Sequence, residues 1–220
     1  MSPHGLFVTL EGIEGAGKST VAQWVCEWLG RHQIRATLTR EPGGTPLAER
    51  VRQIVLERGA EALSPATETL LMFAARGIHL ENLIRPALER GECVVCDRFT
   101  DATRAYQGAG RGVDPAWIES LASQVQGNLQ PDCTLLLDLP VSMGLERARN
   151  RLAGASDRFE AETQAFFERV RSAYLELARR EPQRIRVIDA SVPFDAVERQ
   201  VSTVLERLPL FSRGTGDPPA

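Results

Sequence analysis

The sequence predicts an α/β protein with a parallel β-sheet covered by helices on both faces, folded as one domain over residues 1–213. Short apolar runs such as 93–96 and 134–139 show no polar alternation, which is typical of strands buried on both faces. Segments with apolar residues at helical spacing separate these runs, as in a chain of βαβ units. Neither an internal repeat nor a flexible linker divides the 220 residues.

The strands are predicted from β-rich apolar runs that end at glycine, proline or charged residues. The first run stops at Glu11-Gly12, and the third lies between Gly91 and Asp97. In chain order, the expected strands span residues 6–10, 36–39, 93–96, 134–139 and 185–188.

Capping residues place the ends of several helices. Ser64 and Asp114 are N-cap residues followed by proline, and Gly127 ends the helix that Asp114 begins. Pro86 should kink or split the helix that starts at Ser64, because proline lacks the N–H that a helix needs. The polar tail 214–220 is expected to be disordered. In chain order, the expected helices span about 18–30, 47–56, 64–90, 114–127, 141–152, 160–180 and 193–207.

The composition argues against several functional classes. The formal net charge of −3 gives no global attraction to nucleic acid. No stretch approaches the roughly 18 apolar residues of a membrane span, and the N-terminus lacks a secretory signal, so a cytoplasmic location is expected. Cys93 and Cys96 would point to opposite faces of one strand, which argues against a shared metal ion.

The strongest chemical signal lies between the first expected strand and the first expected helix. The run from Gly12 to Ser19 fits the phosphate-binding pattern GxxxxGK[ST] at every defined position. Its glycines allow a tight turn that aims backbone N–H groups at phosphate oxygens. Lys18 should reach the β- and γ-phosphates of ATP, and the Ser19 hydroxyl should join the shell of Mg²⁺. The residues predicted to bind ATP are Gly12, Ile13, Glu14, Gly15, Ala16, Gly17, Lys18, Ser19 and Thr20.

A second anion site is expected directly after the strand at 93–96. Asp97 can act on Mg²⁺ or its water shell, and Arg98 offers a bidentate fork for another phosphate group. Arg98 is expected to act away from the phosphate-binding loop formed by Gly12 to Ser19 (the P-loop). The glycine-rich run 108–112 follows no strand and is expected to be structural, and no role is expected for the histidines.

Several sequence blocks together resemble bacterial thymidylate kinases. The blocks are 10–20, 39–45, 71–76, 97–99, 105–108 and 157–160, in family order and spread over residues 6–190. The resemblance implies a P-loop nucleoside monophosphate kinase fold with parallel strands in the order 2-3-1-4-5. It also implies a LID, the segment that closes over ATP in this family. It also implies a homodimer that transfers the γ-phosphate of Mg-ATP to dTMP, for dTTP synthesis.

The resemblance also assigns roles around dTMP. Phe73 would stack on the thymine ring and Arg76 would hydrogen-bond its edge. Tyr106 would exclude a ribose 2′-hydroxyl, Glu14 would hold the 3′-hydroxyl, and Arg98 would bind the 5′-phosphate. The residues implied for dTMP are Glu14, Phe73, Arg76, Arg98, Thr103, Tyr106 and Gln107.

The arginine-rich segment 147–158 resembles the LID of this family, at about 149–159. Some members place a catalytic arginine in the P-loop, but that position here is Gly15. The resemblance therefore implies that the LID supplies the cation. The expected catalytic residues are Lys18, Arg98, Arg149 or Arg151, and Arg158.

Two alternatives stay open on the sequence alone. A deoxynucleoside kinase would need a general base, for which Glu41 is available, whereas a phosphate acceptor is already anionic and needs none. A P-loop switch protein would hydrolyse its nucleotide without transfer to an acceptor. The chain lacks the Asn-Lys-x-Asp run typical of a GTPase.

Overall fold

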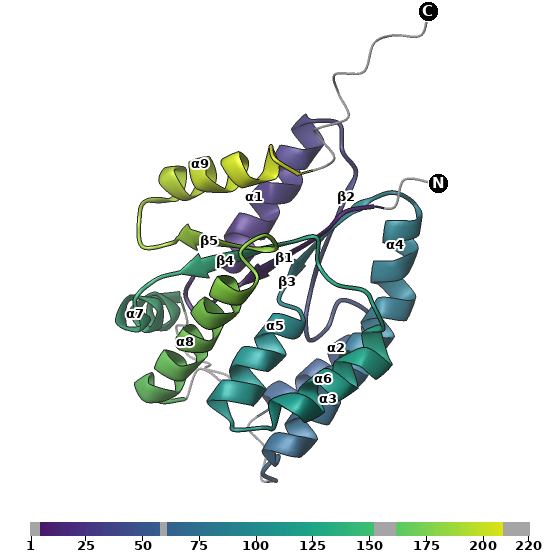
Figure 1. The fold of residues 1–220 in the computed structure, drawn as a ribbon, viewed down its shortest axis with the longest axis vertical. Helices are drawn as coiled ribbons and strands as arrows, with labels where there is room; N and C mark the ends of the chain where they lie inside the picture. Colours follow the sequence, from purple (N-terminus) through teal and green to yellow (C-terminus); the bar gives the residue numbers. More distant parts are fainter. Residues whose placement is uncertain (1–4, 58–60, 152–161, 209–220) are drawn as a thin grey trace, which may run out of the picture.

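The computed structural model describes residues 5–57, 61–151 and 162–208, apart from the Arg151 side chain, and its strands form one parallel sheet (Figure 1). The strand order β2-β3-β1-β4-β5 confirms the order implied by the family resemblance. In a parallel sheet all strands end at one edge, so the loops after β1 and β3 meet there. The strands are β1 (Phe7–Glu11), β2 (Ala36–Arg40), β3 (Cys93–Asp97), β4 (Cys133–Asp138) and β5 (Ile185–Asp189).

Burial on both faces explains the apolar runs. β1 is buried along its whole length, and in β3 and β4 only the terminal aspartate is partly exposed. Alternate residues of β3 enter different apolar clusters: Cys93 packs with the core beneath α1, and Cys96 packs with Phe7 and Phe99. The two cysteines therefore point to opposite faces of the sheet, as predicted.

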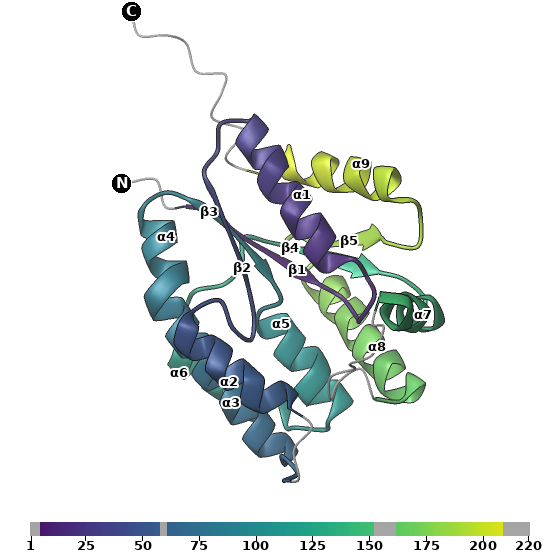
Figure 2. The same cartoon turned by 180° about the vertical axis from the view of Figure 1, so that it is seen from behind.

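Helices cover both faces of the sheet (Figures 1 and 2). α1 (Lys18–Arg31) and α9 (Phe194–Leu205) pack together on one face, and α4 (Arg85–Glu89) and α8 (Gln164–Arg180) cover the other. α7 (Val141–Arg151) packs beside α8. α3 packs against both α2 and α6 in a separate group; these helices are α2 (Pro46–Leu56), α3 (Pro65–His79) and α6 (Pro115–Gln126). Of the helices that the structure describes, none has the length and apolar character that a membrane span requires.

The predicted caps of α3 and α6 are confirmed. The Ser64 side chain accepts a hydrogen bond from Thr67 N, and Asp114 accepts one from Ala116 N. Pro86 lies in the first turn of α4, and a π-helical segment (Leu80–Ile84) separates α4 from α3. The backbone therefore stays helical from α3 to α4, and the expected interruption near the proline takes the form of this π-helical segment.

One helical stretch was not predicted. α5 (Thr100–Thr103) continues into a π-helical segment (Arg104–Gly110) that includes part of the glycine-rich run. Its N-terminus is capped from another element, because Glu11 Oε1 accepts hydrogen bonds from Phe99 N at 2.8 Å and Ala102 N at 3.2 Å. A cap supplied by a residue of β1 leaves no local signal in the sequence. Of the remaining predictions, residues 152–159 of the expected LID and the tail 214–220 lie outside the described residues.

Candidate active site at the carboxyl edge of the sheet

The P-loop connects β1 to α1 through glycines that adopt positive φ angles. Gly12, Gly15 and Gly17 have φ of 137°, 74° and 87°, which side chains disfavour. A Cβ atom on Gly15 would lie only 1.9 Å from the carbonyl oxygen of Gly144 in α7. The P-loop and α7 therefore pack backbone to backbone, and this packing leaves no room for an arginine at position 15.

Lys18 begins α1 and lies buried beneath the loop. Its Nζ donates hydrogen bonds to the carbonyl oxygens of Gly12 at 3.1 Å and Ile13 at 2.9 Å. Burial, and then the neighbouring positive charge of Arg98, lower the pKa of Lys18 to about 8. Two cations placed this close together favour an anion between them.

Asp97 and Ser19 supply oxygen atoms beside the loop. Ser19 Oγ donates to Asp97 Oδ2 at 2.8 Å. Mg²⁺ prefers a few protein oxygens together with waters and substrate phosphates, so these residues fit that ion. Among the described residues, no cluster of three or more acidic, histidine or cysteine side chains could hold a metal ion by itself.

Arg98 contacts the P-loop, which corrects the expectation that it acts away from it. Its φ of 74° is unusual for a residue other than glycine. The guanidinium donates to Gly12 O at 3.1 Å, Glu14 Oε1 at 2.8 Å, and the hydroxyls of Tyr106 at 3.0 Å and Tyr174 at 3.3 Å. Strained backbone at a residue with this many polar contacts is typical of a functional site.

Arg98 also separates two adjoining cavities. The first extends from Arg98 towards α3, and the second surrounds the P-loop and Asp97. Glu14, Glu41, Arg52 and Arg98 line both cavities. The first cavity has an apolar wall of Leu56, Met72, Phe99 and Tyr106, and polar groups from Arg76, Thr103 and Gln107.

Arg76 holds the polar end of the first cavity. Its Nε donates to Glu41 Oε2 at 2.7 Å, and its Nη2 donates to Thr103 Oγ1 at 3.0 Å. Glu41 Oε1 lies 3.2 Å from Nδ1 of the buried His79, so both carboxylate oxygens have partners. Arg76 Nη1 is the buried side-chain atom without a hydrogen-bond partner in the part of the chain that the structure describes. An unpartnered buried donor is costly and points to a ligand.

Phe73 does not line the cavity, which differs from its expected contact with thymine. Its side chain packs against Ile118 and Ala122, with the Arg76 guanidinium 4.8 Å from the ring centroid. Met72 lines the cavity instead. Residues four apart share a helix face, so the spacing of Met72 and Arg76 could have indicated this from the sequence.

The structure brings together most of the predicted site residues. Glu14, Arg76, Arg98, Thr103, Tyr106 and Gln107 line the first cavity, and Gly15, Gly17, Lys18, Ser19 and Asp97 line the second. Arg149 is exposed on α7, where its Nε donates to Leu145 O, whereas the Arg151 side chain and Arg158 lie outside the described residues. Sequence reasoning missed Phe99 in the first cavity and Arg40 and Arg52 beside the P-loop cavity, because their positions depend on tertiary packing. It also missed His79, which contacts Glu41, and Met72, for which the helical spacing from Arg76 was the available signal.

Comparison with known proteins gives a consistent result. The sequence model of the family "Thymidylate kinase" matches residues 10–201. A thymidylate kinase of Pseudomonas savastanoi pv. phaseolicola is 54% identical over 96% of this chain and 99% of its own length. One of Pseudomonas syringae pv. syringae is 55% identical with the same coverage. The crystal structure of thymidylate kinase from Ehrlichia chaffeensis is 34% identical with a TM-score of 0.71, covering 93% of this chain and 99% of that one.

Proposed function

The chain belongs to the thymidylate kinase family and phosphorylates dTMP to dTDP for dTTP synthesis in an ATP-dependent reaction, and we propose that the two adjoining cavities hold its two nucleotides. The cavity towards α3 takes dTMP, and the P-loop cavity takes the phosphates of ATP. Arg98 lines both, where the single phosphate of dTMP would meet the γ-phosphate of ATP.

The buried Nη1 of Arg76 is the observation that carries this proposal. A guanidinium nitrogen is always a donor, so a base that enters this cavity must present an acceptor to it. The O4 atom of thymine meets this requirement. Gln107 and Thr103 line the same cavity, and the Tyr106 hydroxyl, bonded to Glu14 and Arg98, would lie beside the sugar.

The reaction needs charge neutralisation more than proton transfer. The phosphate of dTMP is already anionic, so no general base is required. Lys18, Arg98 and the N–H groups of the P-loop would offset the repulsion between the two phosphate groups and stabilise the in-line transition state. Glu41 is engaged by Arg76 and His79, which argues against the deoxynucleoside kinase alternative, in which it would be a free base.

Mg²⁺ would accompany ATP, with Ser19 and Asp97 as its protein contacts. When bound, the ion would neutralise charge on the β- and γ-phosphates. The Ser19–Asp97 hydrogen bond already holds both oxygens beside Lys18, where these phosphates would lie.

We further propose that residues 1–213 act as one catalytic domain with a LID at about 149–159. Arg149 lies on α7, which packs against the P-loop at Gly15. Arg149 or Arg151, with Arg158, would then supply positive charge to the γ-phosphate on closure.

A homodimer is proposed through the outer surfaces of α2 and α3. Leu47 and Ile54 lie two turns apart on α2 and are 51% and 53% exposed, and Leu70 on α3 is 49% exposed. Large apolar side chains gathered on neighbouring helices favour a protein partner, and we propose a second copy. The four cysteines are free thiols, which suits the reducing cytoplasm proposed as the location.

The placement of dTMP is tested with Arg76→Lys, which keeps a positive charge near Glu41 but removes Nη1. We expect kcat/KM for dTMP to fall about 10- to 100-fold, because one charged hydrogen bond is worth about 1.5–3 kcal/mol. Arg85→Lys is the matched control, since Arg85 bonds to Gln126 O away from both cavities. An unchanged KM for dTMP in Arg76→Lys would place the base elsewhere.

A further inference from the structure

Glu68 lies on α3 behind the first cavity, which we assign to dTMP and call the base cavity, and does not line it. We propose that Glu68 is a positioning residue that determines base specificity, by fixing the side-chain amide of Gln107 so that its carbonyl oxygen faces the base. This rests on the proposed placement of thymine against Arg76 and Gln107. The consequence is selection for bases with an N–H beside a carbonyl, such as thymine, against cytosine.

The geometry around Gln107 sets the direction of its amide. Gln107 is 2% exposed and lines the cavity, and its Nε2 donates to Glu68 Oε1 at 2.8 Å. A carboxylate can only accept hydrogen bonds, so the NH₂ group must face Glu68. Among the described residues, none donates to Gln107 Oε1, which is left for a ligand in the cavity.

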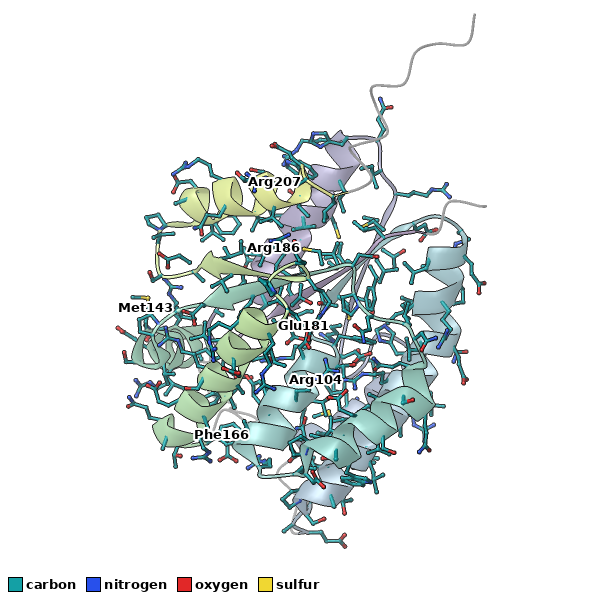
Figure 3. All side chains as sticks on the ribbon, viewed as in Figure 1. Arg104, Met143, Phe166, Glu181, Arg186 and Arg207 are labelled. Carbon is teal, nitrogen blue, oxygen red and sulfur yellow. The ribbon has the colours of Figure 1, made fainter. Side chains whose placement is uncertain are left out.

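Glu68 is itself held in place. It is 1% exposed, and Arg111 Nε donates to the same Oε1 atom at 3.4 Å. Arg111 also pairs with Glu162, and its guanidinium lies 5.0 Å from the ring centroid of Phe166, near the start of α8 (Figure 3). Glu68 Oε1 thus accepts from both Arg111 and Gln107, and a flip of the Gln107 amide would set its oxygen against the carboxylate oxygen.

The two cavity groups match one base edge. Thymine presents its O4 acceptor next to the N3–H donor, whereas cytosine presents a 4-amino donor next to the N3 acceptor. Arg76 Nη1 is a donor and the fixed Gln107 Oε1 is an acceptor, which fits thymine at both positions and cytosine at neither. Arg76 cannot reverse its role, but an unrestrained glutamine can, so Glu68 is needed to reject cytosine at this position.

The test uses Glu68→Gln, which is similar in shape but can accept or donate. The kcat/KM values for dTMP and dCMP are measured on the same preparation, so that their ratio does not depend on the fraction of folded enzyme. We expect the dTMP-to-dCMP ratio to fall about tenfold or more, and KM for ATP to stay within about twofold. If Glu68→Gln does not fold, Glu68→Asp withdraws the carboxylate from Gln107 and should lower the ratio in the same way.

The double variant Glu68→Gln with Gln107→Glu provides a rescue that a purely structural role would not give. The residue-68 amide would donate to the residue-107 carboxylate, and the other carboxylate oxygen would again accept from the base. We expect this pair to restore most of the dTMP preference. Glu119→Gln, which removes one of the two carboxylate partners of Arg104 outside the cavity, should leave the ratio unchanged.

The outcomes separate this inference from the proposed function. If Gln107→Met lowers the ratio but Glu68→Gln and Glu68→Asp do not, thymine is read by Gln107 without help from Glu68, and the inference is wrong. If Gln107→Met also leaves the ratio unchanged, the base does not contact Gln107, and that part of the proposed function fails first.

Discussion

Replacing Arg98 tests the proposed meeting point of the two nucleotides most directly. In Arg98→Ala, the acceptor phosphate would lose two charged hydrogen bonds from the guanidinium, one from each Nη atom, which would replace the bonds to the Tyr106 and Tyr174 hydroxyls when dTMP binds. At about 1.5–3 kcal/mol each, the loss is roughly 3–6 kcal/mol, or about 10²- to 10⁴-fold in kcat/KM for dTMP. Arg98→Lys keeps the charge without the two-pronged guanidinium, so its kcat/KM for dTMP should lie between the values of Arg98→Ala and the wild type.

The structure also predicts a smaller effect on the donor. Arg98 donates to the P-loop carbonyl of Gly12, and its charge lowers the pKa of Lys18. The alanine variant should lose this charge-assisted hydrogen bond to the loop, worth about 1.5 kcal/mol, or about tenfold in ATP affinity. Lys18 would meanwhile become easier to protonate, which opposes this loss.

Two measurements check these expectations. A coupled ADP-release assay gives kcat/KM for dTMP, and titration calorimetry gives the ATP affinity in the absence of dTMP. Arg171→Ala is a suitable control, because Arg171 pairs with Asp138 at the end of β4, outside both cavities. If Arg98→Ala keeps kcat/KM for dTMP within tenfold of the wild type, Arg98 does not hold the acceptor phosphate.

The remaining predictions concern stability, the base cavity and the dimer. Burial and the nearby Asp101 raise the pKa of Glu11 from 4.5 to about 7, so the folded protein binds more protons than the unfolded chain between these values. The stabilisation from this Glu11 proton is present below pH 4.5 and should be lost by about pH 7, a change of roughly 3 kcal/mol in the free energy of unfolding. Urea unfolding of the wild type and Glu11→Gln across this pH range would reveal it. Met72→Ala should raise KM for dTMP severalfold. Phe73→Ala should mainly lower the free energy of unfolding, by about 3 kcal/mol, which a fall in the melting temperature would show. Ile54→Asp should weaken the dimer, which sedimentation velocity would show as a shift to monomer.

Each has an outcome that would contradict it. Equal pH dependence of stability in the wild type and Glu11→Gln would mean that Glu11 titrates normally. A larger rise in the dTMP KM for Phe73→Ala than for Met72→Ala would restore the stacking role to Phe73. An Ile54→Asp variant that sediments like the wild type would exclude this surface as the interface.

Much of the fold could be predicted because it depends on local patterns. Strands such as β3 are buried on both faces, so they are continuous apolar runs. The capping hydrogen bonds of Ser64 and Asp114 reach backbone N–H groups only three and two residues further along the chain. The P-loop is also local, because its glycines and Lys18 must be adjacent in the chain to turn around a phosphate.

The helix at 100–110 could not be predicted for the opposite reason. Its first turn is capped by Glu11, a residue about 90 positions earlier on β1. Its π-helical part packs against α8, whose Phe166 ring would collide with a Cβ atom on Gly110. Neither stabilising contact has a counterpart in the nearby sequence.

The amino-acid sequence by itself determined the phosphate-binding loop, the parallel sheet and the placement of Asp97 and Arg98 directly after a strand, since these depend on neighbouring residues. Only the tertiary structure decided which side chains line the first cavity. Met72 rather than Phe73 lines the cavity, and Glu68 accepts a hydrogen bond from Gln107 without lining the cavity itself. These choices depend on helix rotation and on hydrogen-bond partners distant in the chain, and a residue's type does not reveal either.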